Sequence, residues 1–278
     1  MTTSRRFAQI DVFGAVPYGG NPVAVVLDAE GLSTEQMQRV ACWTNLSETT
    51  FLLAPSDPQA DYRVRIFTPG GELPFAGHPT LGSAHAWLEA GGRPRGELVM
   101  QECGAGLIPL RLGDRLAFAA PPRLRTGPLD DDLLACIVDA FGIGRGDVVA
   151  HQWVDNGPGW TVIQLASADE VLALEPDLAR IPDLMVGAVG AYPPGSPRGF
   201  ELRSFAPAVG VPEDPVCGSM NASVAQWLVG EGLAPEHYLV SQGGRLGRDG
   251  EITIDADPDG TVWVGGATTT CFRGEALL

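Results

Sequence analysis

Two carboxylates stand in sequence surroundings that suit proton transfer or substrate binding. Glu48 lies between a helical segment and the apolar, strand-like run that follows it. If this glutamate is sequestered in a cleft, its pKa rises toward neutrality, and it can both accept and donate a proton. The competing interpretation is a surface glutamate at the start of a strand. Asp214 immediately precedes Pro215, near the start of a predicted helix, where it can bind a substrate ammonium or hydroxyl group.

Two glycine turns, at Gly77 and Gly218, each precede a helix-like run. The start of a buried helix leaves backbone N–H groups without partners and carries the positive end of the helix dipole, so it can bind a carboxylate. His78 and Ser219 follow the two glycines at matching positions, where each side chain can add a donor or cap the helix. The alternative is purely structural, with Ser219 and Asp214 capping a helix that binds nothing.

These elements repeat along the chain. The pattern Arg-x-Phe-x-Pro at Arg65–Pro69 returns at Arg203–Pro207, and each copy is followed by one of the glycine-started helices. Each of these helices is rich in alanine and ends in Trp-Leu, which predicts a helix buried on all sides. Upstream, residues 21–27 precede a helical segment at 33–42, as residues 160–165 precede a weaker helix at 167–180. The ordered set of matches predicts an internal duplication.

The sequence therefore predicts an α+β protein with two pseudo-symmetric lobes, each a β-barrel or sheet wrapped around a central helix. Residues 1–120 are expected to form the N-terminal lobe and residues 121–278 the C-terminal lobe, with the last strand able to cross back. Glycine and proline turns separate many short strands, which favours this architecture over alternating βαβ units. The predicted strands are 62–67, 107–111, 115–119, 200–205, 251–255 and 261–265.

Composition excludes several classes of function. The net charge of −16 disfavours binding to nucleic acid or anionic lipid. The chain has no lysine, which excludes a Schiff base and a Walker lysine.

No metal site is expected, and no signal peptide or membrane span is recognised, so the protein is expected to be soluble and cytoplasmic. The five cysteines form no CxxC pair, which fits reduced thiols, and four of them are expected to be ordinary small core residues.

In several short motifs the chain resembles the PhzF family of phenazine-biosynthesis-like isomerases. The resemblance covers nearly the whole chain in order. It rests on six motifs, which are Asp11-Val-Phe, Gly20-Asn21-Pro22, Ser47-Glu48-Thr49, Phe67-Thr-Pro69, Ala76-Gly77-His78-Pro79-Thr80 and Glu213-Asp214-Pro215-Val-Cys217-Gly218-Ser219. It implies the diaminopimelate-epimerase fold, with the active site in the cleft between two lobes.

The resemblance also implies an activity: isomerisation of a small carboxylate-bearing amino or hydroxy acid by proton transfer, in secondary-metabolite or antibiotic biosynthesis. It implies that Glu48 shuttles the proton without cofactor or metal, while His78 and Asp214 assist catalysis or orient the substrate. The substrate would be held at the helix starts by Gly77, Gly218 and Ser219. A carboxylate bound there offsets the negative charge that develops when a carbon acid loses its proton. A homodimer is implied as well.

Cys217 departs from the family pattern, which has threonine there. It falls where the related diaminopimelate epimerases keep one of two catalytic thiols, and a helix N-terminus lowers the pKa of a thiol. The mirrored residue is Ala76, so a two-thiol arrangement is incomplete. In the isomerase, Cys217 is expected to line the substrate site with Gly218 and Ser219, or to be a packing residue the size of threonine. Two alternatives therefore remain. One is an amino-acid racemase or epimerase that uses Cys217 and Glu48 as opposing bases. The other is a non-catalytic ligand-binding homologue.

Overall fold

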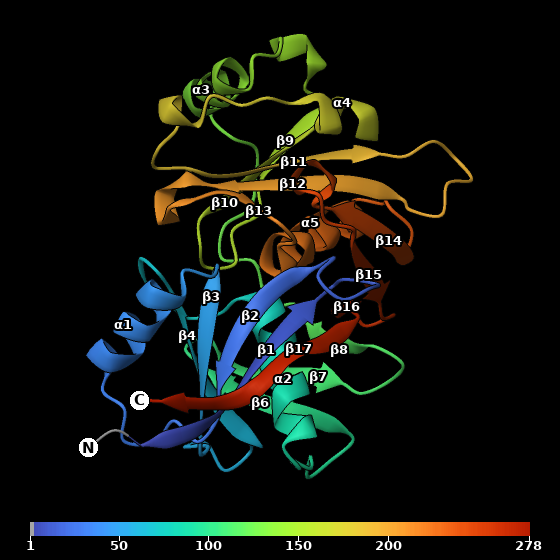
Figure 1. Cartoon of the computed structure of the whole chain (residues 1–278). Helices are drawn as coiled ribbons and strands as arrows, with labels where there is room; N and C mark the ends of the chain where they lie inside the picture. The colour runs from blue at the N-terminus through green and yellow to red at the C-terminus, as the bar shows by residue number, and fades with distance from the viewer. Residues whose placement is uncertain (1–2) are drawn as a thin grey trace. The chain divides into compact units, whose positions relative to one another are not determined.

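The computed structural model describes residues 3–278, which divide into two units (Figure 1). The first unit contains the described residues up to Ala119 together with Trp263–Leu278, and the second contains Ala120–Val262. Helices and strands are mixed in both units, which confirms the predicted α+β class. None of the helices in residues 3–278 is long and apolar enough to cross a membrane.

The first unit is a run of paired strands around one helix. Its strands are β1 (Ser4–Val12), β2 (Asn21–Val26), β3 (Glu48–Leu53), β4 (Tyr62–Thr68), β5 (Gly71–Leu73), β6 (Leu98–Cys103), β7 (Gly106–Arg111), β8 (Leu116–Ala119), β16 (Val262–Gly266) and β17 (Thr268–Leu277). The pairing runs β17-β1-β2-β3-β4-β6-β7-β8-β16, with β5 also paired to β4. The β2–β3 and β4–β6 pairs are parallel and the others antiparallel. The strands at the two ends of this order, β16 and β17, follow one another along the chain, so the paired strands curl into a closed shape.

Helix α2 (Gly77–Glu89) lies inside this curl, and helix α1 (Thr34–Thr44) covers the outside of β3 and β4 (Figure 1). Nine residues of α2 are buried, so it lacks the polar face of a surface helix. The approach to the strands is close, because a Cβ atom on Gly82 would lie 2.3 Å from Cγ1 of Val23 in β2. The predicted buried central helix is therefore confirmed.

The second unit repeats the plan. Its strands are β9 (Ala150–Trp153), β10 (Trp160–Gln164), β11 (Met185–Ala191), β12 (Phe200–Ala206), β13 (Val211–Asp214), β14 (His237–Gln242) and β15 (Gly250–Ala256). They pair in the order β9-β10-β11-β12-β14-β15, with β13 beside β12. The helices are α3 (Asp131–Phe141), α4 (Ala168–Ala173) and α5 (Gly218–Gly230). Short 3-10 turns span Arg145–Asp147, Leu178–Arg180, Pro207–Val209 and Gly244–Leu246.

The two units share strand directions, helix lengths and an ion pair, which confirms the duplication. The order antiparallel, parallel, antiparallel, parallel, antiparallel describes both β1-β2-β3-β4-β6-β7 and β9-β10-β11-β12-β14-β15. The central helices α2 and α5 each contain 13 residues and begin at a glycine. Arg65 pairs with Glu72 across β4–β5, as Arg203 pairs with Glu213 across β12–β13.

Three local expectations were wrong. Residues 167–180 do not form one helix, because α4 ends at Ala173, Leu174 is extended and Pro176 follows. Helix α3 was not predicted, although Asp130 caps its N-terminus and Gly142 ends it in the left-handed conformation. The cysteines are free thiols, but Cys42 and Cys136 are exposed rather than in the core, and only Cys217 is buried.

Candidate active site

Glu48 is the first residue of β3 and is buried, with 8% of its surface exposed. The strand forms because threonine, phenylalanine and leucine follow the glutamate, and β-branched and aromatic side chains suit a packed sheet. Glu48 lies opposite Val23 in the parallel β2–β3 pair, so β2 helps to position it. The alternative of a surface glutamate is therefore wrong.

His78 approaches Glu48 from the start of α2. Its Nε2 atom lies 3.2 Å from Oε2 of Glu48, and the imidazole is 2% exposed. The contact is close but not aligned as a hydrogen bond, and Nε2 has no hydrogen-bond partner among residues 3–278. Burial lowers the pKa of His78 from 6.5 to about 3, although the backbone of Pro22 acts in the opposite direction. The imidazole is therefore neutral near pH 7.

Asn21 contacts the other side of the same imidazole. Its Nδ2 atom lies 3.2 Å from Nδ1 of His78, and the residue is fully buried at the start of β2. Asn21 was not among the predicted site residues. The only sequence signal was its place in Gly20-Asn21-Pro22, and nothing in the spacing indicates that β2 and the start of α2 meet.

In the second unit the start of α5 carries Cys217, Gly218 and Ser219. Cys217 is the N-cap residue, and its side chain makes no capping hydrogen bond, as is also true of Ala76 before α2. Ser219 is the second helical residue, like His78 in α2, so their matching positions are confirmed. Its hydroxyl accepts a hydrogen bond from the indole N–H of Trp160 at 3.1 Å and lies 3.5 Å from Sγ of Cys217.

Asp214 ends β13 and is 9% exposed. Its Oδ1 atom accepts from the backbone N–H of Val216 at 3.1 Å, so it closes a turn just before α5. The side chain of Gln242 holds this turn in place, because Nε2 donates to the carbonyl of Asp214 and Oε1 accepts from the N–H of Cys217. The N-cap position of α5 is Cys217, so neither Asp214 nor Ser219 is the N-cap residue.

Each unit thus supplies a different set of groups. The first has a buried carboxylate beside a neutral imidazole, which suits transfer of a proton to and from carbon. The second has a buried carboxylate next to the start of α5, whose N-cap residue Cys217 makes no side-chain capping bond, which suits binding of a substrate with both an anionic and a cationic group. The expected meeting of the two sets at one substrate stays a prediction.

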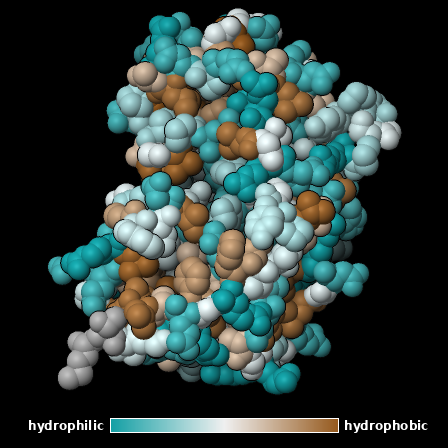
Figure 2. Space-filling model, viewed as in Figure 1, coloured by the Kyte–Doolittle hydropathy of each residue, from teal (hydrophilic) through white to brown (hydrophobic). Residues whose placement is uncertain are grey.

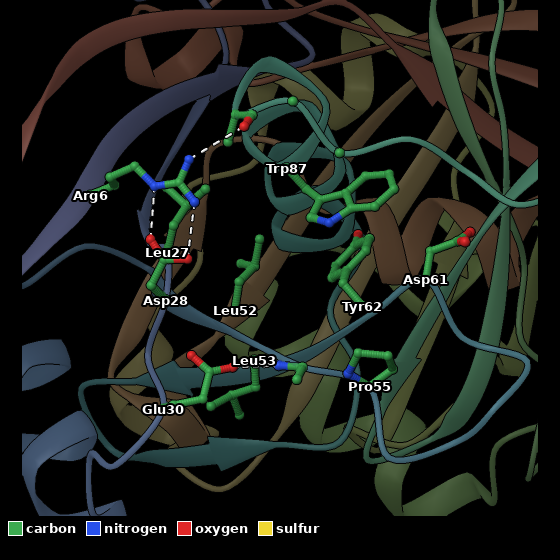
Figure 3. A pocket seen from close by; sticks show the side chains of 14 residues that line it. Arg6, Leu27, Asp28, Glu30, Leu52, Leu53, Pro55, Asp61, Tyr62 and Trp87 are labelled. Carbon is green, nitrogen blue, oxygen red and sulfur yellow. Dashed lines mark hydrogen bonds and ion pairs between the residues drawn. The ribbon is translucent and has the colours of Figure 1, made fainter.

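A separate pocket of about 370 Å³ lies in the first unit at the opposite end of α2 from His78 (Figure 3). Trp87 stacks on Tyr62 there, with ring centroids 5.2 Å apart. Asp28 pairs with Arg6 and neutralises the one cationic side chain that lines this pocket. Helix α2 separates the pocket from Glu48 by nearly its full length, so the pocket is not part of the candidate active site.

Comparison with known proteins identifies relatives of the whole chain. The model of the PhzC-PhzF family, described as phenazine biosynthesis-like protein, matches residues 10–274. Antisense-enhancing sequence 1 of Schizosaccharomyces pombe is 37% identical, with 99% of this chain and all of that protein covered. Trans-2,3-dihydro-3-hydroxyanthranilate isomerase of Pseudomonas aeruginosa is 35% identical, with 98% of this chain and 99% of that protein covered.

A solved structure shows the same fold. The PhzF-family protein of Enterococcus faecalis superimposes with a TM-score of 0.80 over 99% of this chain and all of that chain, at 24% sequence identity. The match confirms the expected diaminopimelate-epimerase-like architecture. Together with the match to the family model and the named relatives, it leads to one conclusion: the chain belongs to the phenazine biosynthesis-like family and is an isomerase.

Proposed function

We propose that the protein moves a double bond in a small carboxylate-bearing amino or hydroxy acid by proton transfer through Glu48, without a cofactor. One observation carries this proposal: Oε2 of buried Glu48 lies 3.2 Å from Nε2 of buried, neutral His78. A carboxylate removed from water is a stronger base toward carbon than an exposed one, and a fixed neutral donor beside it holds the reacting groups in place.

The proposed reaction has two steps. Glu48 removes a proton from an allylic carbon, so that a C–H bond breaks, an O–H bond forms on the carboxyl group, and the electron pair enters the substrate's double-bond system. The protonated Glu48 then returns the proton to another carbon of that system, which shifts the double bond and restores the carboxylate. No electron is gained or lost, and one correctly placed base serves both steps.

The remaining predicted residues are assigned to substrate binding. The N–H groups at Gly77, Gly218 and Ser219 would hold the substrate carboxylate, and Asp214 would bind its ammonium or hydroxyl group. Support comes from the helix starts, where neither Ala76 nor Cys217 provides a capping side chain. A bound carboxylate there offsets the charge that develops in the first step.

The substrate is proposed to resemble that of the named relatives. Two of them, from Pseudomonas aeruginosa and Pseudomonas fluorescens, are called trans-2,3-dihydro-3-hydroxyanthranilate isomerase and are 35% and 36% identical to this chain. That compound is an unsaturated amino acid with a carboxylate, which fits the groups described above. A role in antibiotic or other secondary-metabolite biosynthesis and a cytoplasmic location stay predictions of the resemblance.

The test is hydrogen exchange in D₂O over a panel of small unsaturated amino and hydroxy acids that includes this compound, followed by NMR and mass spectrometry. An isomerase places deuterium on a carbon that gains a hydrogen as the double bond moves. Deuterium confined to the α-carbon, with the double bond unmoved, would contradict the proposal.

The racemase alternative is not favoured. Cys217 is buried at the N-cap of α5, but the matching position in α2 is Ala76, so the opposing thiol is missing. In the proposed isomerase, Cys217→Ser retains exchange within a few-fold of the wild type, because a serine fills nearly the same space. In a racemase it would abolish exchange.

A homodimer through β17 is the proposed assembly. In an antiparallel ladder, the backbone N–H and C=O groups of every second residue bond to the partner strand. Leu278 exchanges both bonds with Thr3, so the backbone groups of Arg273, Glu275 and Leu277 point away from β1. Two copies that pair antiparallel about Gly274 would place Arg273 opposite Glu275, whereas pairing about either charged residue would oppose like charges.

An apolar groove beside this strand supports the same assembly. It has a volume of about 520 Å³, its apolar lining includes Phe7, Val40, Trp43, Leu277 and Leu278, and Trp43 is 86% exposed. Figure 2 shows hydrophobic side chains gathered near the C-terminal end of the chain. In the proposed register, Phe272 of the second copy lies opposite Ala276, which also lines the groove.

A further inference from the structure

The amide of Asn21 contacts the His78 ring, with Nδ2 3.2 Å from Nδ1. Both residues are almost fully enclosed, with 0% and 2% of their surfaces exposed. A buried amide and a buried imidazole in contact restrict each other's orientation and protonation, because a buried polar atom left without a partner costs about 1–3 kcal/mol. The contact therefore bears on which ring nitrogen of His78 carries the proton.

The position of Asn21 is fixed by the chain on either side. Asn21 pairs with Val12 in the β1–β2 ladder. The N–H of Gly20, just before it, lies 3.1 and 3.0 Å from the two carboxylate oxygens of Asp11, which is buried in β1. The backbone passes so close at this point that a Cβ atom on Gly20 would lie 2.1 Å from the carbonyl oxygen of Val12. Asp11 thus anchors the residue that presents the amide.

Hydrogen-bond chemistry then selects a tautomer. An amide nitrogen only donates, so the Nδ1 atom that faces it must accept, and the single proton of a neutral imidazole is left on Nε2. The backbone of Pro22 competes, because proline has no N–H and its carbonyl oxygen can only accept a ring N–H. We propose that Asn21 is a positioning residue that outcompetes the Pro22 carbonyl and holds His78 with its proton on Nε2, the ring nitrogen that lies 3.2 Å from Oε2 of Glu48.

This tautomer gives His78 and Glu48 different chemical roles. This step of the inference rests on the proposed function. With its proton on Nε2, 3.2 Å from Oε2 of Glu48, His78 is a donor and Glu48 is the only base of the pair. In the other tautomer Nε2 would present a lone pair to the carboxylate. Two acceptors would then face each other, and the donor that steadies the carboxylate and the developing charge would be lost.

The first experiment reads the tautomer directly by ¹⁵N NMR of histidine-labelled protein near pH 7. The His78 signals, one set among four histidines, are assigned by their loss in His78→Gln. We expect a protonated Nε2 and an unprotonated Nδ1 in the wild type. Asn21→Ala should reverse this pattern, because a protonated Nδ1 can then donate a hydrogen bond to the Pro22 carbonyl. Asn21→Asp should reverse it too, because a carboxylate of the same shape only accepts.

A matched control separates this effect from the loss of a buried amide. Gln101 is also fully buried in the first unit, but it bonds Tyr62 and Thr80 rather than His78. Gln101→Ala should leave the His78 tautomer unchanged. A wild-type His78 with its proton on Nδ1, or the same tautomer in wild type and Asn21→Ala, would overturn the inference.

Kinetics provide the second readout. Asn21→Ala should lower kcat for the exchange reaction by about 10- to 100-fold, by analogy with the loss of groups that orient metal-bound histidines, with a smaller change in KM. A fall in kcat with no change of tautomer would overturn the inference. Because the NMR result needs no substrate, it decides the matter even if the proposed reaction fails.

Discussion

The Nε2 atom of His78 and the Oε2 atom of Glu48 lie 3.2 Å apart, although one residue begins a strand and the other is in the first turn of a helix. The approach depends on α2 being enclosed by the strands of its own unit, because only a buried helix can direct its first turn at the start of a neighbouring strand. The pair therefore arises from the fold of the first unit rather than from any local motif.

The first prediction concerns the pH dependence of stability. Burial lowers the pKa of His78 to about 3, below the 6.5 of an unfolded histidine. Between these values the unfolded chain binds a proton that the folded chain does not, so His78 makes stability fall as the pH falls from 6.5 toward 3. The slope is at most about 1.4 kcal/mol per pH unit.

Urea unfolding of wild type, His78→Gln and His237→Gln at several pH values measures this contribution. His237 is a surface histidine whose side chain is 71% exposed and paired with Asp255, so its variant controls for the loss of an imidazole outside the candidate site. The slope should be shallower in His78→Gln. An NMR titration that finds a His78 pKa near 6.5 would contradict the assignment of a buried neutral imidazole.

A second prediction uses the duplicated ion pair. The side chains of Arg203 and Glu213 are 5% and 12% exposed, whereas those of Arg65 and Glu72 are 19% and 38% exposed. Glu213→Ala leaves a buried guanidinium without its partner and should destabilise the protein by about 3–5 kcal/mol. Glu72→Ala, at the matching but wetter position, should cost about 1 kcal/mol or less. Denaturant midpoints compare the two, and equal losses would show that burial does not govern these pairs.

The third prediction tests the proposed dimer edge. Proline at position 275 removes an N–H that points away from β1, so Glu275→Pro should leave the β1–β17 ladder largely intact but block pairing with a second copy. Sedimentation should show a shift from dimer to monomer. Glu275→Ala, which keeps the backbone N–H, should remain mostly dimeric. A dimer that survives Glu275→Pro unchanged would place the interface elsewhere.

Much of the fold could be predicted from the sequence because its signals are local. The repeated Arg-x-Phe-x-Pro pattern marks β4 and β12, and Gly77 and Gly218 mark the starts of α2 and α5. The first and last residues of each strand predicted above lie within one residue of those observed. Helix α3 was missed because the acidic run Asp130–Asp132 resembles a linker, although in the structure it caps and begins the helix.

The candidate site was predictable only in part. Glu48 and His78 were identified, but the contact between Asn21 and His78 depends on how β2 packs against the start of α2. That packing is a tertiary relationship that spacing along the chain does not encode. Likewise, Gln242 orders the turn at Asp214 from a strand far along the sequence.

The most direct test of the central claim compares wild type with Glu48→Gln in the D₂O exchange reaction on trans-2,3-dihydro-3-hydroxyanthranilate and related acids. Glutamine keeps the shape of the side chain but cannot carry a proton between carbons. We predict that the wild type places deuterium on the carbon that gains a hydrogen, and that Glu48→Gln slows this exchange by at least about 100-fold while remaining folded. A folded Glu48→Gln protein that exchanges at the wild-type rate would contradict the account.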